Sequence, residues 1–102
     1  MRVIDINAGN WHTIGEFYDA ILAAIGAHPK HGRNINALLE GMVWGRTATL
    51  EPPYAIKIAG LKNAAPEVDT YVRDFQGYLA EARKEFQQSK GHDVDVTMEI
   101  VS

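Results

Sequence analysis

The sequence contains no cysteine, which excludes a disulfide framework and any zinc or redox site built on thiolates. No apolar run approaches the roughly 18 residues of a membrane span, and the first residues lack the basic and apolar segments of a secretory signal. The formal net charge of −3 argues weakly against a general nucleic-acid binder. We therefore expect a cytoplasmic protein with no membrane partner, and we favour a protein partner over nucleic acid.

Sequence signatures of catalysis are also missing. The chain has no G-x-x-x-x-G-K-[ST] loop, no G-x-G-x-x-G turn after a strand, no G-x-S-x-G and no H-E-x-x-H. His28 and His31 are close in sequence, but Pro29 lies between them and no nearby carboxylate completes a set of three metal ligands. We therefore expect a protein that is not an enzyme, with no catalytic residues, no cofactor, no metal and no small-molecule substrate.

What the sequence does contain is typical of one ordinary globular domain. At 102 residues, with 46% hydrophobic and 23% charged positions, the chain is long enough for a single core, and no linker or repeat divides it. Charge is uneven, because residues 65–102 carry eight acidic and four basic side chains. We expect a single domain over residues 1–102 whose acidity lies in its C-terminal third.

The first half of the chain predicts one strand and two helices. A β-branched run at residues 2–6 ends at a turn signal and predicts a strand. Thr13 and Glu16 have the spacing of a capping box, apolar residues follow at helical spacing, and Gly26 predicts the end of that helix. Asn34 is a good N-cap for a short second helix.

The second half predicts two more strands around a long helical region. Residues 54–59 follow a proline-containing turn and residues 94–101 alternate apolar and polar side chains, so both segments predict strands. Between them, Pro66 is suited to a first helical turn, and an apolar stripe continues beyond it. A helix over residues 66–90 would measure about 37 Å, which is longer than short strands offer, so we expect a bend or break near Gly77.

The expected order is strand, helix, helix, strand, helical region, strand. Strands separated by helices favour parallel pairing with right-handed crossover connections. We therefore predict an α/β fold in which three to four helices pack on a three-stranded parallel sheet.

Four carboxylates share one side of the predicted last helical region. Spacings of seven, seven and four residues align them beside the apolar stripe, and basic side chains are interleaved with them. This pattern favours a solvated face over a docking surface for a basic partner. The four residues are Glu67, Asp74, Glu81 and Glu85.

Residues 28–42, HPKHGRNINALLEGM, pass directly from a polar loop into a helical pattern. Lys30 and Arg33 near the start of a helix are typical of an anion site, because the helix dipole and the free N–H groups both favour negative charge. The same stretch is compatible with a protein-docking surface, or with a plain connection between two helices. From spacing alone, the plain connection between two helices is the default interpretation.

The stretch HGRNINALLEGMVWG resembles the signature of the barstar family of ribonuclease inhibitors. The specific matches are Gly32, Asn34, Ala37 and Leu38, and the order of strands and helices along nearly the whole chain is also similar to that of the family. The resemblance implies a barstar-like fold with the element order β-α-α-β-α(α)-β. It also implies that a loop and the second helix plug the active site of a ribonuclease.

The resemblance assigns a role to Glu40, which stands where the family has an inhibitory aspartate and keeps its charge with one more methylene. Other positions depart from the family. Asn36 replaces an aspartate and Leu39 replaces a tryptophan, while Lys30 and Arg33 replace a tyrosine and an acidic residue. Because this stretch carries more basic than acidic side chains, we expect a partner with a less uniformly basic surface than the family's known one.

The function that the resemblance implies is a non-enzymatic inhibitor, or immunity protein, whose partner is a ribonuclease or other nuclease toxin. The alternative is a binding module for RNA, an anion or a regulatory protein at the basic N-terminus of the second helix. The expected partner-binding residues are Lys30, His31, Gly32, Arg33, Asn34, Asn36, Leu39, Glu40, Val43 and Trp44.

Overall fold

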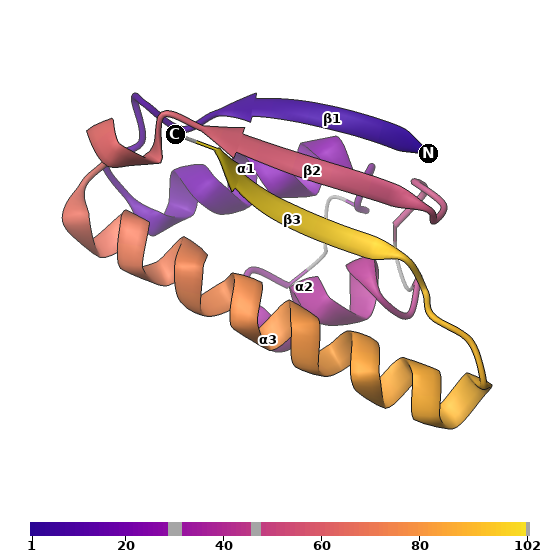
Figure 1. Cartoon of the computed structure of the whole chain (residues 1–102). Coiled ribbons are helices and arrows are strands. Elements are labelled where there is room, and N and C mark those ends of the chain that lie inside the picture. Colours follow the sequence, from indigo (N-terminus) through magenta and orange to yellow (C-terminus); the bar gives the residue numbers. More distant parts are fainter. Residues whose placement is uncertain (29–31, 46–47, 102) are drawn as a thin grey trace.

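The computed structural model describes residues 1–28, 32–45 and 48–101. Within these ranges, strands and helices follow one another in the predicted order, with one additional short 3₁₀ helix, η1, before α3 (Figure 1). The elements are β1 (Arg2–Asn7), α1 (Ile14–Ala24), α2 (Ile35–Met42), β2 (Tyr54–Ala59), η1 (Leu61–Asn63), α3 (Pro66–Lys90) and β3 (Val96–Val101).

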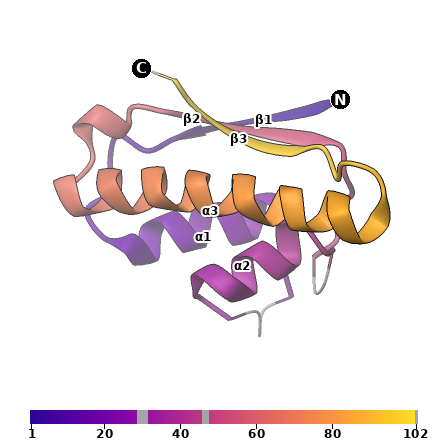
Figure 2. The ribbon, with the colours of Figure 1, turned by 60° about the horizontal axis from the view of Figure 1, so that its bottom comes forward.

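The three strands form a parallel sheet in the order β1-β2-β3, which confirms the predicted α/β fold. Figure 2 shows the sheet as one layer and the three helices together on one side of it. The side chains that point towards the helices are apolar, as at Ile56 and Ile58, which are both fully buried. On the opposite face the register aligns Asp5, Lys57 and Glu99 in one charged row.

The core is centred on Phe17 of α1, which is fully buried. Its ring meets those of Trp11, Tyr18, Tyr71 and Phe75 edge to face, with centroids 5.2–6.0 Å apart. Edge-to-face pairs at this separation stabilise packing beyond the area that they bury. This aromatic cluster therefore fixes α1 against α3.

Local signals in the sequence place both ends of α1 correctly. Thr13 accepts a hydrogen bond from the Glu16 N–H, and the Glu16 carboxylate accepts one from the Thr13 N–H, which is the predicted capping box. At the other end, Gly26 adopts a φ of 63° and its N–H donates to Ala23, while Ala27 donates to Leu22. These two bonds close the helix in a Schellman motif, where a left-handed residue is needed.

Helix α3 is continuous from Pro66 to Lys90, so the predicted bend near Gly77 is wrong. That prediction assumed that the helix has to match the length of the sheet. Instead α3 runs past the sheet and along the longest dimension of the molecule, 39 Å (Figures 1 and 2). Phe86, near its C-terminal end, packs on Trp44 and His92, so the overhanging part of the helix has its own contacts.

A bidentate ion pair joins the C-terminal half of α3 to the loop before β3. The Arg83 guanidinium donates to both carboxylate oxygens of Asp93, and the N–H of Asp95 donates to the same carboxylate at 3.1 Å. These bonds favour the ionised form, and they lower the pKa of Asp93 from its ordinary value of 3.8, with the bond from Arg83 as the largest cause. Asp93 therefore stabilises the fold in its charged state.

Replacing Gly26 or Gly77 by alanine should change the free energy of unfolding in opposite directions. A Cβ on Gly26 would lie 2.0 Å from the Thr49 hydroxyl oxygen on a left-handed backbone, whereas a Cβ on Gly77 meets nothing within 4 Å inside a helix. Gly26→Ala should lower the free energy of unfolding by about 1–3 kcal/mol. Gly77→Ala should raise it by up to about 1 kcal/mol. Urea unfolding measures both, and a stabilising Gly26→Ala would contradict the geometry.

The Arg83–Asp93 pair makes the stability of the fold depend on pH. Because folding lowers the pKa of Asp93, the ionised carboxylate stabilises the folded state fully above pH 3.8. This stabilisation is lost as the pH falls through the pKa that Asp93 has in the folded state. Asp93→Asn should therefore be less stable than the unmodified chain at pH 7, and the gap should narrow below about pH 3.8. Chemical unfolding across pH 2–7 measures the gap, with Arg83→Gln as a second variant that removes the same pair. A gap that stayed constant with pH would show that the pair does not act in this way.

Candidate functional site

The loop that precedes α2 is tied to α1 by one arginine. Nη2 of Arg33 donates to the backbone oxygen of Gly15 at 2.7 Å and lies 2.8 Å from Oδ1 of Asp19. Its guanidinium carbon also stands 5.8 Å from the centre of the Tyr18 ring, within the range of a cation–π contact. Within the chain, Arg33 therefore positions the loop, and its expected contact with a partner stays a prediction.

The predicted N-cap of α2 is confirmed. The Asn34 side-chain oxygen accepts a hydrogen bond from the N–H of Ala37 at 2.8 Å, which satisfies one of the free donors of the first turn. Gly32 stands where a Cβ would lie 3.0 Å from the Cβ of Ala37, so the loop passes close to the helix that it leads into. Two of the expected site residues, Asn34 and Gly32, thus shape the start of α2. Lys30 and His31 lie outside the described residues.

Helix α2 presents Asn36 and Glu40 to solvent. The two residues are four positions apart and therefore share one face of the helix. Neither side chain makes a hydrogen bond or an ion pair with any other residue in the described ranges. This face accordingly offers one amide and one carboxylate that are available to a partner.

Val43 differs from the other expected site residues. Its side chain is 2% exposed and belongs to the main core, because the apolar side of α2 continues past the end of the helix. Including it among the residues that contact a partner is therefore a misassignment. Trp44 is half-buried, with its ring 5.0 Å from that of Phe86, so part of its surface remains accessible.

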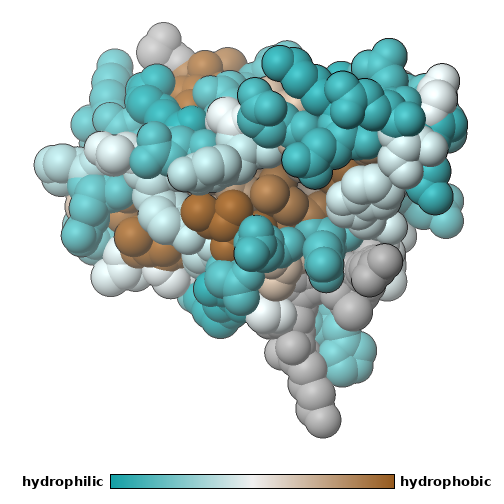
Figure 3. Space-filling view, turned by 90° about the horizontal axis from the view of Figure 1, so that it is seen from below, coloured by the Kyte–Doolittle hydropathy of each residue, from teal (hydrophilic) through white to brown (hydrophobic). Residues whose placement is uncertain are grey.

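A groove runs between α2 and α3, next to the face that carries Asn36. It has a volume of about 500 Å³ and combines apolar walls with hydroxyl and amide groups. Figure 3 shows hydrophobic side chains in the middle of this side of the molecule, surrounded by hydrophilic ones. The lining residues are Asn34, Ile35, Asn36, Leu39, Tyr71 and Tyr78.

Tyr71 and Tyr78 were not among the expected site residues. Their spacing of seven places them on one side of a helix, but the sequence does not show that α2 lies beside that flank. The Tyr71 hydroxyl is held 2.6 Å from that of Tyr18, whereas Tyr78 is 50% exposed. Burial, and next the hydrogen bond to Tyr71, raises the pKa of Tyr18. The bond between the two hydroxyls holds Tyr71 in place as one wall of the groove.

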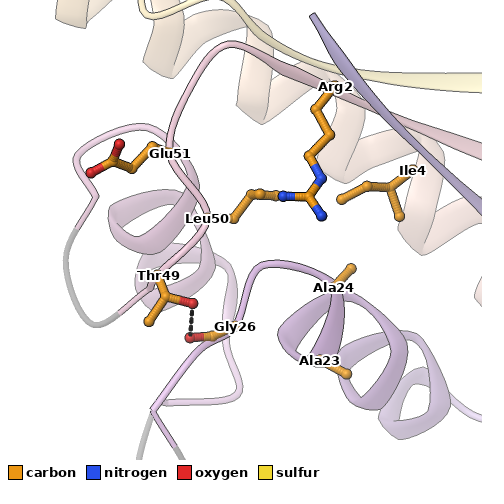
Figure 4. A pocket seen from close by; sticks show the side chains of 8 residues that line it. All are labelled: Arg2, Ile4, Ala23, Ala24, Gly26, Thr49, Leu50 and Glu51. Carbon is orange, nitrogen blue, oxygen red and sulfur yellow. Dashed lines mark hydrogen bonds between the residues drawn. The ribbon is translucent and has the colours of Figure 1, made fainter.

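A second hollow, of about 470 Å³, lies at the C-terminal end of α1 (Figure 4). Arg2 reaches across it between Ile4 and Leu50, while the carboxylate of Glu51 points away. The rest of the lining includes the small residues Ala23, Ala24 and Gly26. Beside the hollow, the Thr49 hydroxyl donates to the backbone oxygen of Gly26 at 3.2 Å. None of the expected site residues lines this hollow, so it is separate from the α2 surface.

Two further classes of site have no support among the described residues. No three histidine or carboxylate side chains in residues 1–28, 32–45 and 48–101 are arranged to hold a metal ion. None of the helices described is both long and apolar enough to cross a membrane. The exposed groups that the structure brings together are instead those of α2 and of the adjoining groove.

Comparison with known protein families gives a match. The family model Barstar, described as barstar (barnase inhibitor), covers residues 1–99, which include β1, β2, all the helices described and most of β3. The resemblance inferred from the α2 stretch is thereby confirmed. No curated protein matches the chain.

The contacts of Arg33 predict an order of stability among variants. Asp19→Asn removes only an exposed ion pair and should lower the free energy of unfolding by about 0.2–1 kcal/mol. Arg33→Gln also loses the bond to Gly15 and the contact with the Tyr18 ring, so it should be the more destabilising change. Urea unfolding of both single variants and of the double variant gives the coupling energy. If Arg33→Gln cost no more than Asp19→Asn, Arg33 would not hold the loop.

Proposed function

The chain belongs to the barstar family, and on that premise we propose that it is a non-enzymatic inhibitor, an immunity protein, of a ribonuclease toxin. In this proposal the loop before α2, together with α2 itself, covers the active site of the ribonuclease. The observation that carries the proposal is the family match over residues 1–99. The exposed, uncommitted side chains of Asn36 and Glu40 on α2 support it.

Glu40 provides the central contact of the proposed complex. A ribonuclease cleft binds phosphates with arginine and lysine side chains, and a carboxylate can take the place of a phosphate through charge-assisted hydrogen bonds. Glu40 is exposed and has no ion-pair partner in the described ranges, so no internal pair has to break before it binds. Its side chain has one more methylene than an aspartate and reaches further from the helix.

Because Asn36 is uncharged, this face of α2 is less acidic than it would be with a carboxylate at residue 36 as well as at Glu40. An amide both donates and accepts hydrogen bonds and carries no charge, so it suits a mixed polar surface better than a row of cations. We therefore propose a ribonuclease whose cleft is basic opposite Glu40 and neutral opposite Asn36. The site of action would be the cytoplasm, where the RNA that such a toxin attacks is found.

The alternative function, an RNA or anion site at the N-terminus of α2, has weaker support. Such a site needs uncompensated positive charge, because phosphate neutralisation supplies most of the affinity. Arg33, the cation that the described ranges contain at this position, is paired with Asp19. A protein partner is therefore the better-supported ligand of this surface.

The proposal predicts a specific effect of Glu40. The test uses any nuclease encoded beside this gene, together with barnase, and measures binding and RNA cleavage with and without the chain. Glu40→Gln should weaken inhibition at least about tenfold, because it removes the charge and keeps the shape. Glu99→Gln, the same chemical change on the helix-free face of the sheet, should leave inhibition unchanged. Absence of both binding and inhibition with either nuclease would show that the proposed function is wrong.

A further inference from the structure

The groove between α2 and α3 has an acidic border on its α3 side. Asp74 follows Tyr71 by three residues and precedes Tyr78 by four, and Glu81 follows Tyr78 by three. At these spacings the two carboxylates and the two tyrosines occupy one flank of the helix. Because the tyrosines line the groove and both carboxylates are exposed, the acidic groups stand along its edge.

The charges of α3 are segregated around the helix. Arg73 and Lys84 lie more than about 100° around the axis from Tyr78, at 3.6 residues per turn. Arg73 pairs with Asp69 at 2.6 Å, which keeps its charge away from the groove. The flank beside the groove is therefore negative, while basic groups project from the other sides of the helix.

The two carboxylates at the groove remain available for binding. Asp74 makes no ion pair with any residue in the described ranges. Glu81 lies 3.8 Å from the Lys84 ammonium, but both side chains are at least 70% exposed, and such surface pairs hold their partners weakly. A partner's arginine or lysine can thus compete for both groups.

The interior of the groove is suited to binding an apolar side chain. Ile35 and Leu39 from α2 face the tyrosine rings of α3 across a volume of about 500 Å³. Tyr78 is one of the most exposed large hydrophobic side chains in the described ranges, at 50%. A ring in this position combines an apolar face with a hydroxyl that can still reach water, a pattern that is common in binding surfaces.

We propose that this groove receives an apolar or aromatic side chain of the ribonuclease, flanked by arginine or lysine residues that pair with Asp74 and Glu81. The inference rests on the proposed function and adds the chemistry of the partner. Charge complementarity selects this occupant, because an apolar groove with a negative border matches an apolar side chain set among cations. The carboxylates that meet most of the partner's basic groups are then on α3, whereas α2 contributes only Glu40.

In this proposal, the carboxylates spaced along α3 form part of a binding surface, whereas their spacing in the sequence favours a plain solvated face. Their exposure is as expected, but the sequence does not show that a groove runs beside them. The proposal also accommodates the basic character of the loop before α2, because attraction to a basic partner no longer depends on that loop. The ribonuclease would then present most of its cations to α3, and to α2 a surface that is basic opposite Glu40 and neutral opposite Asn36.

The test compares two double variants that change the net charge equally. Asp74→Asn/Glu81→Gln alters the border of the groove, and Glu51→Gln/Glu99→Gln alters two exposed carboxylates that do not line it. Binding to barnase and to any nuclease encoded beside this gene is measured at several salt concentrations. We expect the dissociation constant of the first variant to rise at least about tenfold with a shallower salt dependence, and that of the second by less than about twofold.

Tyr78→Ala tests the interior of the groove separately. Because the side chain is half exposed, its removal should leave the fold intact, which urea unfolding verifies. We expect this variant to bind at least about fivefold more weakly than the unmodified chain, since a groove-filling contact is lost. Sedimentation of the free chain at increasing concentration should show a monomer. A dimer that Tyr78→Ala abolished would make a second copy the occupant and overturn the proposal.

The outcomes separate this inference from the proposed function. If neither nuclease binds the unmodified chain, the proposed function fails and the groove proposal fails with it. If a nuclease binds and is inhibited but Asp74→Asn/Glu81→Gln behaves like the control pair, only the groove proposal is overturned. If the groove variants bind the nuclease more weakly and the control variant Glu51→Gln/Glu99→Gln binds it normally, the result supports both the proposed function and the groove proposal.

Discussion

The packing of Phe17 among four aromatic rings determines where the exposed surfaces of this molecule lie. Because the ring touches Tyr18 from its own helix and both Tyr71 and Phe75 from α3, it fixes the distance and the rotation between α1 and α3. Arg33 then stands over Tyr18 and bonds to α1, which places the start of α2. The groove follows from that arrangement, since Tyr71 forms one of its walls.

Much of the fold could be predicted because its signals are local. The capping box at Thr13 and Glu16, the Asn34 cap and the proline that opens α3 each depend on groups within one helical turn. The bend expected at Gly77 was wrong for a different reason. A comparison of helix length with strand length ignores what lies beyond the sheet, and here α1, α2 and the loop before β3 provide the additional packing surface.

The candidate site was less predictable, because its parts come together only through tertiary packing. The residues of α2 could be named from their resemblance to a family, yet Val43 proved to be a core residue. The ion pair of Arg33 with Asp19 joins the loop before α2 to helix α1, so no pattern within either segment reveals it. Tyr78 likewise belongs to a site only because α2 lies next to it.

The charged row on the helix-free face of the sheet has a consequence for self-association. An open sheet ends in two strands with unpaired backbone groups, and such edges can recruit further strands from other molecules. Here the two edge strands are β1 and β3, and the row places Asp5 on one and Glu99 on the other. A β1 edge that approached the β3 edge of another copy in the same register would bring like charges together. Repulsion between Asp5 and Glu99 therefore opposes edge-to-edge polymerisation of the sheet. It acts on the face of the sheet that no helix covers.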